Sequence, residues 1–479
     1  MSVDAPPASA LLDRVRRHAE ERPAAIAYQV PGGASLTYRD LAGAIASLAE
    51  ALRGALPAGA TVILCAPNQL EYPIAFLAVL AAGCRLFPVS PESADAELLR
   101  AASEAGAAGV IGDDRAMARL GPKMRFALPI ESVALAGSGP IRSATQGALL
   151  LQSSGTTGLP KIVVRTGASL DAAADAMSDA IGFRPDDRVL MTIPLTHSYG
   201  LEHGLFAPLW AGSGITLFQR LTLPAVLPEL TDGGITILPG VPSTFEMLAR
   251  VADAKVSMGN LRLAYSAGAP LPRAVFDAFA ARFGVRVTQL YGASEIGSVS
   301  YNPPADPFDP ASVGRPMRGV SIRILDPNPN GREGQVAVRA ESMFASYLNE
   351  PAGLIDGHFP TGDLGHVDDS GRLFVTGRIK LLIDVGGFKV NPLEVEAVLQ
   401  QHPAVAACVV VAVRQSQTVF RLKAILTPAH PGATVPIEEL RQLARAHLAA
   451  YKIPRLFEVR DSLPRSATGK ILRDQLETA

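Results

Sequence analysis

The chain has 479 residues, 48% of them hydrophobic, and its 44 Lys plus Arg nearly balance 45 Asp plus Glu, for a formal net charge of −1. This length predicts roughly two to four domains or subdomains of about 150 residues each. The balanced charge gives no global field for nucleic acid or an anionic membrane, so neither is an expected partner and any anion site must be local. The longest apolar run, Ile74 to Cys84, is shorter than the ~20 residues that span a bilayer, so no membrane span is expected.

The N-terminal segment carries charges where a signal peptide needs an apolar stretch, so we expect a cytoplasmic protein. The three cysteines, Cys65, Cys84 and Cys408, lie in apolar surroundings without the spacing of metal ligands. They are interpreted as reduced core residues.

From residue 25 to about 115, short β-branched or apolar runs alternate with longer helical patterns, which predicts an α/β layered fold. One example is a strand at 60–66 followed by a helix at 71–82. Thr37, with Asp40 three residues later, predicts a capping box at the start of another helix.

The segment 153–161 offers backbone amides, four hydroxyls and one ammonium to a polyphosphate. Apolar runs at 148–151 and 162–164 flank it, so the loop is predicted to join two strands rather than to open a helix. The Walker spacing is absent, and no G-x-G-x-x-G follows a strand here. A plain Gly/Ser hairpin remains the alternative interpretation.

The α/β pattern continues with predicted strands at 188–194, 214–218 and 261–266, a helix start near Gly200 and a helix at 242–251. After Gly319, turn-rich short strands predict a small antiparallel β subdomain. We expect a domain boundary at 378–380, which gives an N-terminal domain at 1–378 and a smaller α+β domain at 379–479. In the latter, strands are predicted at 405–413 and 421–427, and Asn391 before Pro392 predicts a helix start.

Four further motifs accompany the 153–161 loop: Tyr291-Gly292-Ala293-Ser294-Glu295, Thr361-Gly362-Asp363, the segment 377–396, and Pro464 to Lys470. Each motif alone is weak, but five in register over more than 300 residues are specific. In this order and spacing, the chain closely resembles the adenylate-forming superfamily of acyl-CoA synthetases, nonribosomal adenylation domains and luciferases.

The resemblance implies an enzyme in which a carboxylate attacks the α-phosphate of ATP to give an acyl adenylate, and a thiol then takes the acyl group. Catalysis must neutralise and orient two anions, with little need for a protein nucleophile. The resemblance also implies Mg²⁺, held by Glu295 with the Thr156 hydroxyl as a second contact. The implied nucleotide-binding residues are Ser153, Ser154, Gly155, Thr156, Thr157, Gly158, Lys161, Gly268, Ala269, Tyr291, Gly292, Ala293, Ser294, Glu295, Asp363, Arg378 and Lys470.

Within that set, Tyr291 would offer an aromatic face to adenine, and Asp363, assisted by Arg378, would accept hydrogen bonds from the ribose hydroxyls. In isolation these residues also fit plain structural roles, as core packing for Tyr291 and a turn residue for Asp363. Lys470 would stabilise charge on the reacting carboxylate and α-phosphate, and it is the implied catalytic lysine together with Lys161.

The resemblance further implies a C-terminal domain that rotates between the two half-reactions, with Lys380 at the hinge. The thiol would then approach along Gly386, Gly387 and Lys389. Their alternative interpretation is a turn between two strands beside a surface charge.

The implied acyl pocket comprises His197, Tyr199, Glu202, Ala267, Gly268, Ala293 and Ser298. His197 occupies the place of a gate beside the substrate carboxylate, and is a candidate catalytic residue. Glu202 is unexpected, because a carboxylate facing the acyl group would disfavour a second carboxylate and could accept a hydrogen bond from a substrate hydroxyl or amine, unless it points to solvent.

Small residues permit a flat ring or an acyl chain, so the expected substrate is a hydroxylated aromatic or medium-length acid. We expect no fused carrier module, and therefore a free-standing acid:CoA ligase with CoA as co-substrate. The alternative is an enzyme that loads a separate acyl carrier protein, and a nonenzymatic ATP-binding protein is a further rival.

Overall fold

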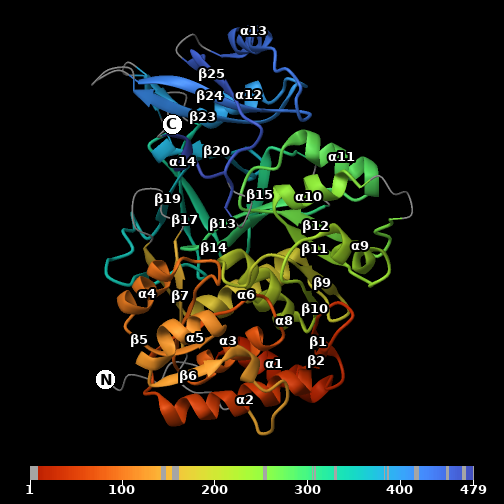
Figure 1. Ribbon diagram of the computed structural model, residues 1–479, viewed down its shortest axis with the longest axis vertical. Helices are drawn as coiled ribbons and strands as arrows, with labels where there is room; N and C mark the ends of the chain where they lie inside the picture. Colours follow the sequence, from red (N-terminus) through yellow and green to blue (C-terminus); the bar gives the residue numbers. More distant parts are fainter. Residues whose placement is uncertain are drawn as a thin grey trace. The chain divides into compact units, whose positions relative to one another are not determined.

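The computed structural model of the chain describes residues 9–141, 147–153, 161–251, 256–304, 306, 309–327, 332–381, 383–385, 388–414, 420–448, 452–466 and 471–477. Within them the chain forms two compact units (Figure 1). Unit 1 comprises Met1–Ser321 with Val338–Phe359, and unit 2 comprises Ile322–Ala337 with Pro360–Ala479. The hinge expected at 378–380 concerns a rotation between domains and stays a prediction.

Unit 1 contains a seven-stranded sheet in the order β18-β8-β7-β4-β3-β5-β6. The strands β7, β4, β3, β5 and β6 run parallel, whereas β8 pairs antiparallel with both β7 and β18. The bounds are β3 Thr61–Cys65, β4 Arg85–Pro88, β5 Ala107–Gly112, β6 Phe126–Pro129, β7 Ala148–Gln152, β8 Ile162–Thr166 and β18 Ser346–Tyr347. The segment 153–161 therefore joins two antiparallel strands, and the prediction that it does not open a helix is confirmed.

A second sheet of unit 1 has the strand order β15-β14-β13-β12-β11-β9-β10-β1-β2. From β13 to β1 the neighbouring strands are all parallel, which is the arrangement of α/β folds. The bounds are β1 Ile26–Gln29, β2 Ser35–Thr37, β9 Arg188–Met191, β10 Gly214–Leu217, β11 Ile237–Gly240, β12 Leu263–Ser266, β13 Val287–Ala293, β14 Gly297–Tyr301 and β15 Ser312–Pro316.

Helices connect the parallel strands of unit 1, and in Figure 1 α10 and α11 lie beside β11 to β13. The helices are α1 Ala10–Glu21, α2 Tyr38–Ala55, α3 Glu71–Ala81, α4 Asp95–Glu104, α5 Asp114–Leu120, η1 Gly121–Lys123, η2 Ile130–Ser132, α6 Gly167–Ile181, α7 Ser198–Leu201, η3 Glu202–Phe206, α8 Ala207–Ala211, α9 Leu223–Thr231, α10 Pro242–Ala249 and α11 Arg273–Phe283. The η3 segment is a single π-helical turn, a form that is frequent at functional sites.

Four strands in the order β16-β17-β19-β20 have most of their residues in unit 2. Its other elements include a hairpin of β21 with β22 and a sheet of β23, β24 and β25. The bounds are β16 Ser321–Leu325, β17 Gly334–Arg339, β19 Phe359–Val367, β20 Leu373–Arg378, η4 Ile379–Leu381, β21 Ile383–Val385, β22 Phe388–Val390, α12 Pro392–Leu399, β23 Val405–Arg414, β24 Phe420–Pro428, α13 Ile437–His447, β25 Leu456–Val459 and α14 Asp474–Glu477.

Two helix starts confirm the capping predictions. The Thr37 side chain accepts a hydrogen bond from the Asp40 amide, and the Asp40 carboxylate accepts one from the Thr37 amide, which is a capping box at the start of α2. Asn391 caps α12, with Pro392 in its first turn. The mixed α/β fold class is likewise confirmed by these elements.

The apolar core follows the predicted strands and helices. Helix α3 is buried over nearly its whole length, and so is β3, because nearly all of their residues are apolar. Cys65, Cys84 and Cys408 are buried and unpaired by disulfides, as predicted. No helix in the described ranges is both long and apolar enough to cross a membrane.

Candidate functional site

The predicted site segments of unit 1 follow the carboxyl ends of parallel strands. The segment 195–202 comes after β9, Ala267 to Ala269 come after β12, and 291–295 ends β13. In open α/β sheets ligands bind outside these ends of the strands. The fold therefore collects the acyl-pocket and adenine-site candidates at one edge of one sheet.

The ends of the predicted phosphate loop are joined by hydrogen bonds. The Ser153 amide donates to the Lys161 carbonyl at 2.8 Å, and the Lys161 amide donates to the Ser153 hydroxyl at 3.2 Å. Ser153 is buried, and Lys161 is exposed. The loop thus leaves and re-enters the sheet at one point, and residues 154–160 between them lie outside the described residues.

Lys161 and Glu295 are brought close by a third residue, Tyr347 of β18. The Lys161 ammonium lies 4.8 Å from the centroid of the Tyr347 ring, and the Tyr347 hydroxyl donates to Glu295 Oε1 at 3.2 Å. Lys161 Nζ also pairs with Glu350 Oε2 at 2.5 Å. Lys161, predicted to bind phosphate, and Glu295, predicted to bind the metal ion, therefore belong to one small cluster of side chains.

A tight turn carries Glu295 between β13 and β14. The pairing register shifts between Tyr291 and Gly292, and a β-carbon on Gly292 would lie 2.4 Å from the Gly297 carbonyl oxygen. Only glycine fits that approach, and such bulges often stand next to active sites. The Phe344 amide donates to the Glu295 carbonyl at 2.7 Å, which fixes the far side of the turn.

Glu202 is fully buried in an ion pair that the sequence did not predict. Arg165 Nη1 lies 2.6 Å from Glu202 Oε1, and the two side chains are 0% and 2% exposed. The amide and hydroxyl of Ser298 both donate to Glu202 Oε2 at 2.8 Å, and the Ser198 hydroxyl donates to Oε1 at 3.3 Å. Glu202 thus accepts hydrogen bonds at about the four positions that a carboxylate offers.

For Glu202 the sequence allowed two positions, facing the acyl group or pointing to solvent. The buried ion pair with Arg165 is neither of these. Its acceptor positions are used within the protein, so a hydrogen bond from a substrate hydroxyl finds no support here. The sequence contained one usable signal, since Arg165 interrupts the apolar strand that begins at Ile162. A charge in a buried strand requires a partner of opposite charge.

The same network ties Arg165 to the turn that carries Glu295. Arg165 Nη2 donates to the Ser342 carbonyl at 3.0 Å, and the Ser342 hydroxyl donates to the Ile296 carbonyl at 2.8 Å. Gly297, at φ +72°, has no side chain there, and a β-carbon would lie 2.9 Å from Glu202 Oε1. The buried ion pair is therefore packed directly against the turn.

Beside Glu202, three aromatic side chains form a hydrogen-bonded cluster. His203 Nδ1 lies 2.9 Å from the Tyr265 hydroxyl, and its Nε2 lies 3.3 Å from the Ser298 hydroxyl. The Tyr199 hydroxyl donates to the Gly240 carbonyl at 3.0 Å. Burial lowers the pKa of His203 to about 4, even though the Glu202 charge opposes the shift, so this imidazole is neutral at pH 7.

The remaining acyl-pocket candidates differ in their exposure. Ala267 is buried at the end of β12, whereas Gly268 and Ala269 are exposed. Gly268 has φ +84°, a conformation that favours glycine. His197 lies open to solvent, although the protein around it desolvates the ring and lowers its pKa. Within the described residues, no hydrogen bond or ring contact joins the His197 side chain to the other members of the set, and its role stays a prediction.

In unit 2, Asp363 and Arg378 are paired as neighbours on β19 and β20. The two residues are directly opposite in the antiparallel register, and Arg378 Nε lies 2.5 Å from Asp363 Oδ1. Asp363 is buried, with its amide bonded to the Thr361 hydroxyl at 3.1 Å. The structure thus brings together the two residues to which the sequence assigned the ribose.

Several predicted residues lie outside the described part of the chain. These are Ser154, Gly155, Thr156, Thr157, Gly158, Gly386, Gly387 and Lys470. For Lys380 and Lys389 only the backbone is described. Their proposed roles rest on the motifs alone.

The donor set around Glu295 suits a metal ion that arrives with a nucleotide. Within the described residues, no three His, Cys, Asp or Glu side chains gather as a ready-made metal site. Mg²⁺ is commonly held by one or two carboxylates together with substrate phosphates and water. A single carboxylate close to a lysine fits that mode.

Sequence reasoning missed several polar residues near these segments: Arg165, His203, Tyr265, Tyr347 and Glu350. It also missed two buried hydroxyls, Thr196 Oγ1 and Ser266 Oγ, for which no hydrogen-bond partner is found in the described chain. Ser266 ends β12, and Thr196 follows β9. Only Arg165 gave a signal in the sequence.

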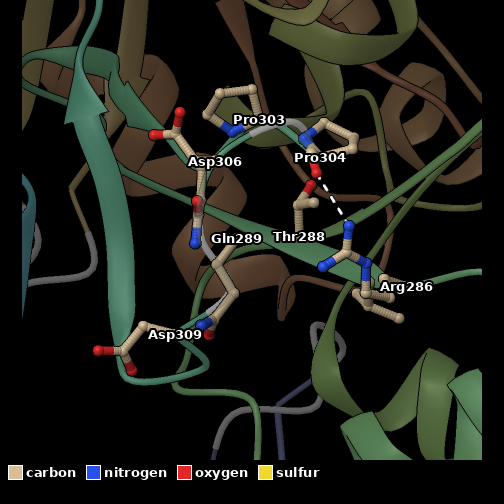
Figure 2. Close-up of a pocket in the computed structure, with 9 residues that line it drawn as sticks. Arg286, Thr288, Gln289, Pro303, Pro304, Asp306 and Asp309 are labelled. Carbon is tan, nitrogen blue, oxygen red and sulfur yellow. Dashed lines mark hydrogen bonds between the residues drawn. The ribbon is translucent and has the colours of Figure 1, made fainter.

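A separate shallow hollow, open to solvent, lies at the start of β13 (Figure 2). Arg286, Thr288 and Gln289 line it, and Arg286 donates to the Pro304 carbonyl at 3.0 Å. None of the predicted site residues lines this hollow. The chemistry predicted from the motifs belongs to the opposite end of the same strand.

Comparison with known families gives two matches that together cover most of the chain. The family described as AMP-binding enzyme matches residues 15–348, and the AMP-binding enzyme C-terminal domain matches residues 394–470. These matches include the Ser153 to Lys161 segment, the Glu295 turn and Lys470. The resemblance to adenylate-forming enzymes drawn from the motifs is therefore confirmed.

Curated relatives are similar at about 30% identity. A probable CoA ligase, CCL8, from Humulus lupulus is 32% identical over 69% of this chain, an alignment that spans 61% of that protein's length. An oxalate–CoA ligase from Arabidopsis thaliana is 29% identical over 98% of both chains. Among solved structures, ATP-bound MatB from Rhodopseudomonas palustris is 25% identical and superposes with a TM-score of 0.90, covering 98% of this chain and 99% of that one.

Proposed function

Because the chain belongs to the family of AMP-binding enzymes, we propose that it is an AMP-forming acid:CoA ligase. In the first half-reaction a substrate carboxylate attacks the α-phosphate of ATP and pyrophosphate leaves. In the second, the CoA thiol attacks the acyl carbon and AMP leaves. The observation that carries this proposal is the cluster in which Lys161 and Glu295 both contact Tyr347, a cation and an anion held side by side.

The residues proposed to bind the nucleotide have chemistry suited to their parts. The Lys161 ammonium would neutralise phosphate oxygens, next to the closed ends of the loop at Ser153. When bound, Mg²⁺ would supply positive charge to the phosphates, and Glu295 is the residue proposed to hold it. Asp363, with Arg378 beside it, would accept hydrogen bonds from the ribose.

For the substrate acid, we propose that the part beyond the reacting carboxylate is uncharged and is either an aromatic ring or a chain of medium length. Among the described acyl-pocket candidates, Glu202 is neutralised by Arg165, and its neighbour His203 is neutral at pH 7. Among these described candidates, no unpaired cation is therefore offered to the second carboxylate of a short dicarboxylate. Tyr199, Ala267 and Ser298 suit a flat ring or a chain instead.

The experiment is an ATP–pyrophosphate exchange assay on the purified full chain with benzoate, 4-coumarate, octanoate, malonate and oxalate. We expect exchange with one or more of the first three acids and little with malonate or oxalate. Exchange confined to malonate or oxalate would overturn the acid class. No exchange with any carboxylic acid would overturn the adenylation itself.

Lys470 and the acceptor are tested in separate half-reactions. Lys470→Ala should abolish adenylate formation while it spares thioester formation from a supplied acyl adenylate, and equal loss in both half-reactions would contradict its role. Supplying CoA or a purified acyl carrier protein with the same adenylate identifies the acceptor, and transfer to the carrier alone would overturn the CoA assignment.

A further inference from the structure

Tyr347 is fixed to the predicted phosphate strand by the backbone. It lies opposite Val163 in the antiparallel pairing of β18 with β8. The Ala345 amide donates to the Val164 carbonyl at 2.9 Å, and the Leu348 amide donates to the Ile162 carbonyl at 2.7 Å. The position of Tyr347 beside Lys161 is therefore set by main-chain hydrogen bonds rather than by its own side chain.

The Tyr347 side chain contacts two charges of opposite sign through different atoms. Its ring faces the Lys161 ammonium, 4.8 Å from the centroid, and its hydroxyl donates to Glu295 Oε1 at 3.2 Å. Phe344 packs edge-on against the same ring, with centroids 4.9 Å apart, and restricts its orientation.

Three residues further along, Glu350 supplies a counter-ion to Lys161. The distance from Lys161 Nζ to Glu350 Oε2 is 2.5 Å, and the two side chains are 49% and 55% exposed. An ion pair this exposed contributes little to stability and exchanges readily with other anions. A carboxylate here occupies the place at the ammonium that a phosphate oxygen of a nucleotide would need.

We propose that the segment from Tyr347 to Glu350 controls the two charged side chains of the nucleotide site, Lys161 and Glu295. Tyr347 is a positioning residue that holds the Glu295 carboxylate toward the metal–nucleotide complex and the Lys161 ammonium toward the phosphates. Glu350 is an internal competitor that the phosphates displace when they bind. This inference rests on the proposed function, because it assumes that Lys161 and Glu295 act on Mg-ATP.

The test measures ATP binding to the full chain by titration calorimetry, once with excess EDTA and once with saturating Mg²⁺, without any acid substrate. Tyr347→Phe keeps the ring and removes only the hydroxyl. We expect unchanged ATP binding in EDTA and about threefold to tenfold weaker binding with Mg²⁺, the fold-change that corresponds to loss of one ordinary net hydrogen bond. Tyr347→Leu should also weaken binding in EDTA by about twofold to fivefold, because the cation–π contact is lost.

Glu350→Gln should shift ATP affinity in the opposite direction. Removing the competing carboxylate should tighten binding by about twofold to fivefold in both conditions. Glu341→Gln is the matched control, since Glu341 is an exposed carboxylate that precedes Tyr347 in the chain and forms no ion pair within the described residues. It removes the same charge and should leave the affinity unchanged.

The inference is overturned if Tyr347→Phe binds ATP with the wild-type magnesium dependence, or if Glu350→Gln binds no more tightly than Glu341→Gln. Both outcomes are distinct from failure of the proposed function. If the proposed function were wrong, the wild-type chain itself would neither bind Mg-ATP nor exchange pyrophosphate with any acid.

Discussion

Two ion pairs, one just before strand β8 and one within it, differ in burial and in the number of hydrogen bonds around them. Lys161, just before the strand, pairs with Glu350 where both side chains are about half exposed. Arg165, within the strand, pairs with Glu202 where neither is accessible to water. The first pair can exchange its partner for a ligand. The second cannot, since separating it would leave a charge buried without compensation.

The difference in burial indicates which of the two ion pairs has a structural role. Around Arg165 and Glu202 the hydrogen bonds continue to Ser298 and Ser342, so the pair holds together β8, η3 and the turn before β14. Around Lys161 the partner is one carboxylate and one aromatic ring. We therefore expect substitutions at the buried pair to change stability, and substitutions at the exposed pair to change ligand binding.

The largest expected effect is that of Glu202→Leu. This change leaves the Arg165 guanidinium buried without its counter-ion and should lower the free energy of unfolding by about 3–5 kcal/mol. Urea denaturation followed by the fluorescence of Trp210, the single tryptophan of the chain, measures it, because Trp210 lies in α8 directly after η3.

The double variant Arg165→Met with Glu202→Leu is the control for that prediction. It removes both charges, so most of the lost stability should return, and the two single changes should be strongly non-additive. If Glu202→Leu were as stable as wild type, or if the double variant were less stable than both single variants, the ion pair would not have the role assigned here.

A smaller effect is expected from His203 as pH falls. Its pKa is about 4 in the folded chain against 6.5 for an ordinary histidine, so the unfolded chain binds the proton first. The contribution of neutral His203 to the free energy of unfolding is present above pH 6.5 and declines as pH falls towards 4. The decline between pH 7 and pH 5 is about 2 kcal/mol. Unfolding measured at both pH values should show this loss in wild type and not in His203→Gln. Equal losses would assign the pH dependence to other groups.

Gly297→Ala should have an effect of about 1–2 kcal/mol. The residue has φ +72°, which disfavours a side chain, and the new methyl group would lie against Glu202 Oε1. Gly284→Ala is a useful comparison, because Gly284 has φ +70° with nothing within 4 Å of the added carbon. Thermal unfolding should show a larger loss at Gly297, and equal losses would mean that the buried pair tolerates the methyl group.

The smallest stability effect is expected for Glu350→Gln. Exposed ion pairs contribute about 0–1 kcal/mol, so the free energy of unfolding should change by less than about 1 kcal/mol even though nucleotide affinity changes. Measuring both quantities on one preparation decides the comparison between the two ion pairs. A loss as large as that of Glu202→Leu would show that the exposed pair is structural.

Much of the fold was predictable because its signals are local. The apolar runs on either side of the 153–161 loop identified two strands, and Thr37 with Asp40 identified a helix start, since capping and periodicity depend on neighbours in sequence. The Arg165–Glu202 pair was not predictable in the same way. Its partners are 37 residues apart in the sequence and meet only when the fold brings η3 close to β8.

The sequence by itself determined the family of the chain and the α/β class, and it supplied the residues that we propose for phosphate, magnesium and ribose, because these are carried by contiguous motifs with fixed spacing. Only the tertiary structure decided that Glu202 is an internal counter-ion and that Tyr347 joins Lys161 to Glu295. The physical reason is that the pKa, burial and pairing of a charge depend on which distant segments exclude water around it.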